Sequence, residues 1–304
     1  MPGLFDTRLL IVTGKGGVGK TTVAAALALS AARAGKKTLV CEVNTQERVT
    51  RLLGKMEAGP EVRQVDQCLW AVDVRPEEAM REYALMTLKF KTVYRAVFEN
   101  RVVRYFLRFL PSLQELVLLG KILFHERERD PSGAPRFDRI IVDAPATGHA
   151  ITFFSVPQVL VDTVPAGPLQ TEAARMRDVL VDPEVTAAVL VSLPEELPVN
   201  ETIELDGALR SRVRISPSAV VLNGFIPQRF TDEEVASLAA RPSLGPLVRV
   251  HRERERASAD ALARLHDRLW LPIVTVPRLY AETFGPDAIA EVARYLEGAR
   301  GGGR

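Results

Sequence analysis

The sequence predicts an α/β fold in which a mostly parallel sheet is flanked by helices on both faces. Two observations lead to this fold class: short apolar runs recur along the chain, and stretches with helical spacing separate them. A third observation, the absence of a strand pattern over residues 76–130, adds an α-helical insertion lobe to the sheet. We expect residues 1–300 to form a single domain and the glycine-rich residues 301–304 to be a disordered tail.

Seven apolar runs have the length and composition of buried parallel strands. They are residues 9–12, 37–43, 69–74, 139–143, 187–193, 219–223 and 273–276. The alanine-rich stretch 21–34 follows the first run and is expected to be a helix that ends near Gly35. The chain therefore opens with a strand, a glycine loop, a helix and a second strand.

The insertion lobe has apolar residues at helical spacing with basic residues scattered between them. This pattern predicts about three helices. Their apolar faces either pack on a core of their own or form a surface for a hydrophobic client or partner. The charged stretch 249–256 predicts a solvated helix face with alternating signs.

Composition narrows the classes of partner and compartment. The chain has 304 residues, 47% of them apolar, and a net charge of only +2, so bulk positive charge does not point to a nucleic acid. Its two cysteines, Cys41 and Cys68, form no Cys-x-x-Cys pair, which argues against a zinc site built from cysteines. The N-terminus lacks the layout of a secretion signal, and no apolar stretch approaches the length of a membrane span. We expect a cytoplasmic protein.

The strongest motif is the glycine loop that follows the first strand. Residues 14–21, GKGGVGKT, match the phosphate-binding pattern G-x-x-x-x-G-K-[ST] between a predicted strand and a predicted helix, which is the context that the pattern requires. Such a loop turns backbone N–H groups toward phosphate oxygens at a helix N-terminus. The sequence thus predicts a P-loop NTPase that binds ATP with Mg²⁺. The predicted nucleotide-binding residues here are Gly14, Gly16, Gly17, Val18, Gly19, Lys20, Thr21 and Thr22.

Three residues have defined chemical roles in this prediction. Lys20 is expected to contact the β- and γ-phosphates, and the Thr21 hydroxyl to ligate Mg²⁺. Asp143 ends the predicted strand 139–143, where a carboxylate near a phosphate loop is placed to hold a water of the Mg²⁺. The metal prediction is therefore Thr21 and Asp143.

The string that begins at Asp143, DAPATGHAITFF, resembles the signature of the arsenical pump-driving ATPase family, which also contains the ATPase that targets tail-anchored membrane proteins. Further resemblances are LPEELPVNET at 193–202, Asn223 in VVLNGFIP and the loop that starts at Pro277. Together they span roughly residues 8–297. The resemblance implies an ATPase that hydrolyses ATP to ADP and phosphate.

The resemblance also implies roles for residues outside the phosphate-binding pattern. Lys15, the extra lysine of a deviant Walker A loop, would reach across a dimer interface to the partner's nucleotide. Asn223 and Pro277 would lie beside the adenine base. The implied assembly is a nucleotide-gated homodimer, or a heterodimer with a paralogous subunit.

Two departures from the family pattern bear on activity. Asn44 stands where the family has the aspartate that orients the attacking water, and an asparagine cannot accept a proton. Glu42, on the same face of the strand, either replaces that carboxylate or holds a Mg²⁺ water. The family's arsenite-binding cysteines have no counterpart. Three roles remain open: delivery of a hydrophobic segment to membranes, an anion-pump ATPase subunit, or a switch that binds ATP but hydrolyses it poorly.

Overall fold

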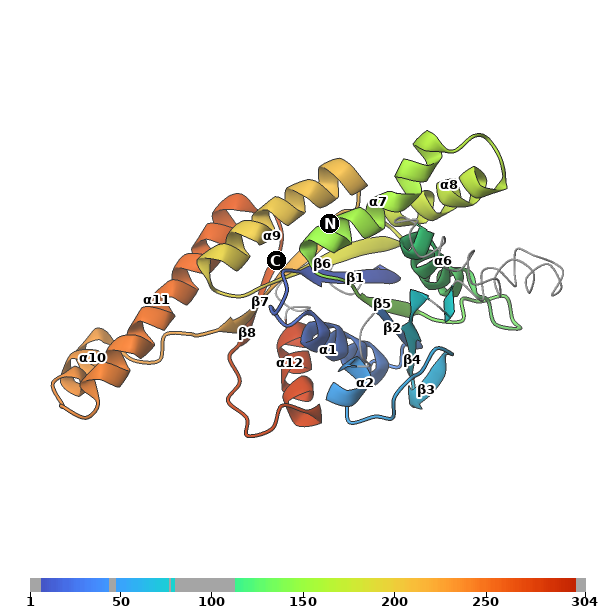
Figure 1. The fold of residues 1–304 in the computed structure, drawn as a ribbon. Helices are drawn as coiled ribbons and strands as arrows, with labels where there is room; N and C mark the ends of the chain where they lie inside the picture. The colour runs from blue at the N-terminus through green and yellow to red at the C-terminus, as the bar shows by residue number, and fades with distance from the viewer. Residues whose placement is uncertain (1–6, 44–47, 77, 80–112, 299–304) are drawn as a thin grey trace, which may run out of the picture.

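Eight strands form one sheet in the computed structural model, which describes residues 7–43, 48–76, 78–79 and 113–298 (Figure 1). The order across the sheet is β3-β4-β2-β5-β1-β6-β7-β8, and every neighbouring pair is parallel except β3 with β4. The strands are β1 Leu9–Gly14, β2 Thr38–Val43, β3 Arg63–Asp66, β4 Leu69–Val74, β5 Arg139–Asp143, β6 Thr186–Ser192, β7 Pro217–Phe225 and β8 Ile273–Pro277. The predicted mostly parallel sheet is confirmed.

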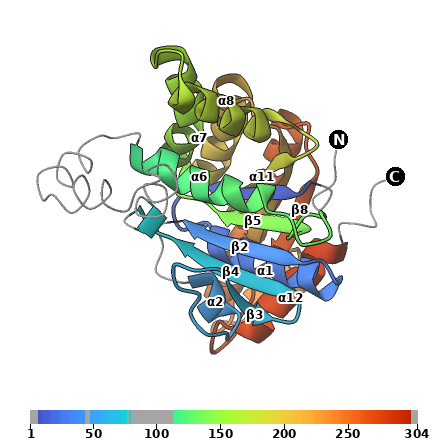
Figure 2. The same cartoon turned by 90° about the vertical axis from the view of Figure 1, so that its right-hand side faces the viewer.

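Helices cover both faces of the sheet, as the sequence predicts (Figures 1 and 2). One face carries α1 Lys20–Arg33, α2 Arg48–Leu52 and α12 Pro286–Gly298. The other carries α6 Leu113–Arg127, α7 Thr147–Thr163, α8 Pro168–Val181, α9 Glu196–Ala208 with the short π-helix η1 Leu209–Val213, and α11 Gly245–Arg268. The short α10, Asp232–Ala239, contacts α11.

The alternation of side chains along each strand divides the interior into two cores. Leu9 and Ile11 of β1 pack into the core under α6, α7 and α9, whereas Leu10 and Val12 pack under α1 and α12. This is the period of two that a strand imposes. Both faces of the strand are therefore buried, which explains why it reads as a continuous apolar run.

The seven predicted strands are all present; β4 and β5 have the predicted bounds, and no end of the others differs by more than two residues. The eighth, β3, was not predicted. Its residues, Arg-Gln-Val-Asp, are mostly exposed, and it pairs antiparallel with β4 at the edge of the sheet. An edge strand with polar residues on both faces lacks the apolar pattern by which buried strands are recognised.

Much of the predicted insertion lobe, residues 80–112, lies outside the described residues, as does the tail 301–304. Within the predicted range 76–130, α6 packs directly on the sheet, with Leu116, Leu119, Ile122 and Leu123 buried in the core. That helix is part of the main core. The lobe as a whole and its boundaries stay predictions.

The order of strands defines where a ligand can bind. β1 lies in the middle of the sheet, with β5 on one side and β6 on the other. In open parallel sheets the crevice lies outside the carboxyl ends of the strands, where neighbouring connections lead in opposite directions. The loop after β1 and the end of β5 lie at this edge.

Candidate functional site

The glycine loop connects the end of β1 to the start of α1. Gly14 has φ +152, and a Cβ there would lie 2.3 Å from the Val191 carbonyl oxygen of β6, so only glycine fits. Gly19 precedes the helix in the left-handed conformation, with φ +93. Val18 between them is 1% exposed and anchors the loop in the core beneath α1. The loop is thus fixed at both ends and in its middle.

The loop fits an anionic ligand. Added Cβ atoms at Gly16 and Gly17 would meet no atom of the described residues within 4 Å, so these residues leave the backbone there open to an approaching group. The first turn of α1 contains no acidic residue, and no side chain in the described part of the chain caps its N-terminus. Its N–H groups and the helix dipole are therefore available to phosphate oxygens.

Lys20 folds back over the loop. Its Nζ donates to the Lys15 carbonyl oxygen at 2.9 Å. Burial lowers the pKa of Lys20, and the neighbouring Asp143 carboxylate partly opposes that effect. A desolvated ammonium gains more from an opposite charge than a solvated one. The geometry and the electrostatics both suit a phosphate contact.

Thr21 and Asp143, the two predicted magnesium residues, lie together. The Thr21 hydroxyl donates to Asp143 Oδ2 at 2.8 Å, although 122 residues separate them in sequence. Asp143 is 1% exposed. A hydroxyl and a carboxylate are the oxygen donors that Mg²⁺ prefers, and next to a phosphate loop they fit a Mg²⁺ that also contacts phosphate.

Together with Asp143, two more carboxylates form a row across neighbouring strands of the sheet. Asp143 of β5 lies opposite Glu42 of β2, which in turn lies opposite Asp73 of β4. Both Glu42 and Asp73 are completely buried. Glu42 accepts a hydrogen bond from the Thr50 N–H at 3.2 Å. In the described part of the chain, no three His, Cys, Asp or Glu side chains converge on one metal position.

Asp73 is a residue that the sequence interpretation missed. Its Oδ2 accepts from Arg75 Nε at 2.5 Å, while its Oδ1 is buried without a hydrogen-bond partner among the residues that the structure describes. Burial raises the pKa of Asp73, and the contact with Arg75 opposes this. The sequence feature that could have identified Asp73 is a single acidic residue in an otherwise apolar strand, Leu-Trp-Ala-Val-Asp-Val.

Asn223 contacts the loop directly. Its Nδ2 donates to the Val18 carbonyl oxygen at 2.9 Å, and a Cβ on Gly19 would lie 2.3 Å from the same nitrogen. Pro277 ends β8, the neighbouring strand. The predicted adenine-side pair therefore lies at the loop edge of the sheet, and Asn223 also braces the loop, which the sequence did not indicate.

Lys15 points away from its own loop toward α9. Its Nζ lies 2.9 Å from Glu201 Oε1, and both side chains are 30% exposed. Glu201 belongs to the segment 193–202 but had no assigned role. Thr22 lies in the first turn of α1, and Asn44 lies outside the described residues.

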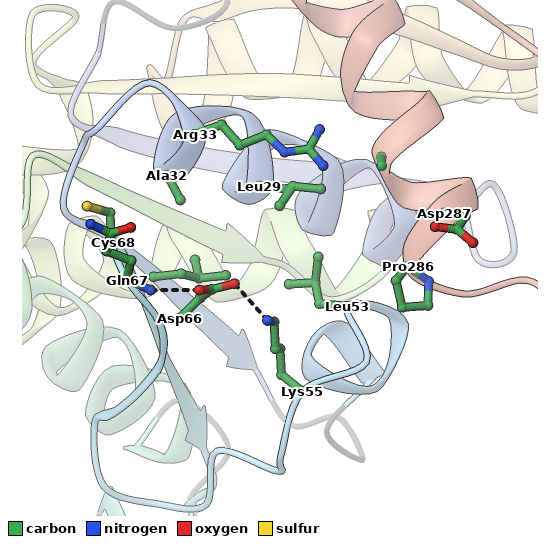
Figure 3. A pocket seen from close by; sticks show the side chains of 12 residues that line it. Leu29, Ala32, Arg33, Leu53, Lys55, Asp66, Gln67, Cys68, Pro286 and Asp287 are labelled. Atoms are coloured by element: carbon green, nitrogen blue, oxygen red, sulfur yellow. Dashed lines mark hydrogen bonds and ion pairs between the residues drawn. The ribbon is translucent and has the colours of Figure 1, made fainter.

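A separate cavity of about 360 Å³ opens at the other end of α1 (Figure 3). Leu29, Leu53 and Pro286 supply apolar walls, and Lys55 pairs with Asp66 at 2.7 Å beside them. None of the predicted nucleotide residues lines this cavity. It is not part of the candidate site.

A fixed glycine loop, a lysine and a threonine–aspartate pair at the carboxyl edge of a parallel sheet define a P-loop nucleotide-binding protein. Across the described residues, no helix combines the length and apolarity that a membrane crossing requires. The model of the anion-transporting ATPase family matches residues 7–166 and 169–298. The chain therefore belongs to this ArsA-like ATPase family, and the predicted resemblance is confirmed.

Several curated proteins are similar to the chain. ATPase BagA of Mycobacterium tuberculosis is 32% identical over 248 residues, covering 78% of this chain and 70% of that protein. A putative arsenical pump-driving ATPase of Halobacterium salinarum is 25% identical over 98% of this chain and 46% of its own length. The arsenical pump-driving ATPase of Acidiphilium multivorum is 26% identical over 76% of this chain and 41% of its own length.

Proposed function

We propose that this chain binds Mg²⁺ and ATP and hydrolyses the nucleotide to ADP and phosphate as a nucleotide-gated dimer. The observation that carries the proposal is the hydrogen bond between Thr21 and Asp143 beneath a phosphate loop. It joins the two oxygen donors that a nucleotide-bound Mg²⁺ requires. Membership of an ATPase family supports the same chemistry.

The residues divide the work in the following way. The loop N–H groups and Lys20 would hold the phosphates and neutralise the charge that develops during transfer. Thr21 and Asp143 would hold Mg²⁺, which would act as a Lewis acid toward the phosphate oxygens. Buried Glu42, which lies opposite Asp143 in the sheet, would either orient the attacking water or hold a water of the Mg²⁺.

Dimer gating is the second part of the proposal. Lys15 would contact the partner's nucleotide, and loss of the γ-phosphate would relax residues 143–149 and open the dimer. Gly148 and His149 in this segment are exposed at the start of α7 and so are accessible to a second subunit. A homodimer and a heterodimer with a paralogous subunit both fit this scheme.

A hydrolysis-poor switch is the second candidate function, and one observation favours it. Asn44 replaces a residue that would orient the attacking water. A chain without that carboxylate would bind ATP and form the closed dimer, and the dimer would reopen only slowly. Hydrolysis then would depend on Glu42 or on a paralogous subunit.

A metalloid pump receives less support from the described residues. Burial raises the pKa of Cys41 to about 12, so its thiol stays protonated and unreactive. In the strand register Cys41 faces Val72, four residues beyond Cys68, so the two thiols do not form a pair for a soft metalloid.

Turnover measurements test the proposal. We expect purified protein to release phosphate from ATP in a Mg²⁺-dependent reaction, Lys20→Ala to abolish it, and Asn44→Asp to accelerate it. Phosphate release by the wild type at the rate of the Asn44→Asp variant would argue against the switch. If neither protein binds ATP, the whole proposal fails.

A further inference from the structure

The ion pair between Lys15 and Glu201 has a place in the fold that suggests regulation. Lys15 follows Gly14 in the phosphate loop, and Glu201 lies in the second turn of α9. The pair at 2.9 Å therefore joins the loop to the helix that follows β6. In this arrangement the lysine is held within its own protomer.

The pair can exchange partners. Both side chains are 30% exposed, so solvent reaches the ammonium and the carboxylate. An ion pair of this kind is weak and screened by salt, because water competes for both groups. A phosphate of the nucleotide bound to a second subunit carries more charge than one carboxylate and would displace Glu201 from Lys15.

An exposed apolar side chain lies beside the pair on α9. Leu197 lies one helical turn before Glu201 on the same side of α9 and is 57% exposed. The neighbouring Glu196 and Glu204 form no ion pair within the described residues, so the contact with Lys15 is specific to Glu201.

We infer that Glu201 is a latch: it holds Lys15 in the separate protomer, and ATP-driven dimerisation requires Lys15 to leave it. The inference rests on the proposed function, because it needs Lys15 to contact the partner's nucleotide. Its consequence is that dimerisation without nucleotide is disfavoured, since Lys15 would lose Glu201 and gain no phosphate.

Sedimentation velocity with Mg²⁺ and a slowly hydrolysed ATP analogue tests the latch in Glu201→Gln. Loss of one exposed ion pair should change the dimer dissociation constant by a factor of about 1.5 to 5 for each protomer. Two latches open per dimer, so the dimer dissociation constant should fall roughly 2- to 25-fold. The matched control is Glu204→Gln, the same change three residues along α9 at an exposed position, which should leave the constant unchanged.

The effect must act through Lys15. In a Lys15→Ala background, Glu201→Gln should leave the dimer dissociation constant unchanged, and in the wild-type background its effect should shrink at high salt. A weaker dimer in Glu201→Gln, an unchanged one, or an equal effect with and without Lys15 would each overturn the latch.

Nucleotide binding by the monomer separates this inference from the proposed function. ATP affinity measured at concentrations below dimerisation should be the same in wild type and Glu201→Gln. If the wild type binds no ATP, the proposed function fails and the latch with it. If it binds ATP and dimerises but Glu201→Gln behaves like Glu204→Gln, only the latch fails.

Discussion

Replacing Asn223 by alanine should weaken nucleotide binding through the loop itself. Asn223 Nδ2 donates to the Val18 carbonyl oxygen at 2.9 Å and lies against Gly19, so it supports the loop from β7. One such hydrogen bond contributes about 0.5–1.5 kcal/mol. If the unsupported loop must be reordered by the ligand, ATP affinity should fall roughly 2- to 13-fold.

The assay compares ATP with tripolyphosphate, which carries no base. A bracing role predicts that Asn223→Ala weakens both ligands by a similar factor, because both use the loop. Asn223→Asp should be at least as harmful, since a carboxylate cannot donate to the Val18 carbonyl oxygen. Titration calorimetry, with tripolyphosphate as a competitor, gives both affinities.

The same substitution should lower the stability of the ligand-free protein. The Val18 residue is 1% exposed, and its carbonyl oxygen would lose a partner. A loss of about 1 kcal/mol corresponds to a fall in melting temperature of roughly 2 °C in a chain of this size. An unchanged tripolyphosphate affinity, with ATP alone weakened, would refute the bracing argument and leave only a contact with the base.

Three further predictions concern the rest of the fold. Burial lowers the pKa of His125 below its usual value of 6.5, so the unfolded chain binds a proton that the folded chain excludes. The free energy of unfolding should therefore fall as the pH drops from the unfolded pKa of His125 toward its folded pKa. Urea titrations at several pH values should show a weaker dependence of this free energy on pH in His125→Asn. A thiol reagent should label only Cys68 in the native protein and both cysteines in urea, because the pKa of buried Cys41 is about 12; rapid native labelling of two thiols would contradict this. Gly54→Ala should lower the urea midpoint more than Gly59→Ala, because both glycines have positive φ but only the Gly54 Cβ would approach Pro286, at 2.7 Å from its Cγ; equal midpoints would show that the crowding is relieved.

The sequence predicted the features that follow from local pattern. Buried strands such as β1 and β6 are continuous apolar runs, and the phosphate loop has a fixed spacing between its glycines and Lys20. The approach of Asp143 to Thr21 was also predictable, because carboxyl ends of parallel strands meet at one edge.

The features that were missed depend on packing or on side-chain direction. β3 has no apolar face, so its pairing with β4 leaves no trace in composition. The row of Asp73, Glu42 and Asp143 arises from the register between three strands that are not consecutive in sequence. The ion pair of Lys15 with Glu201 joins residues 186 positions apart, and no spacing rule reports such a contact.

Calorimetric titration of Mg²⁺ and ATP into the wild type and Lys20→Ala tests the central claim most directly. The account predicts one saturable site in the wild type. A charge-assisted hydrogen bond is worth about 1.5–3 kcal/mol, so Lys20→Ala should bind roughly 10- to 150-fold more weakly. Lys36→Ala, which removes an exposed lysine beyond the other end of α1, should bind like the wild type. Equal affinity in wild type and Lys20→Ala would contradict the assignment of this loop as the nucleotide site.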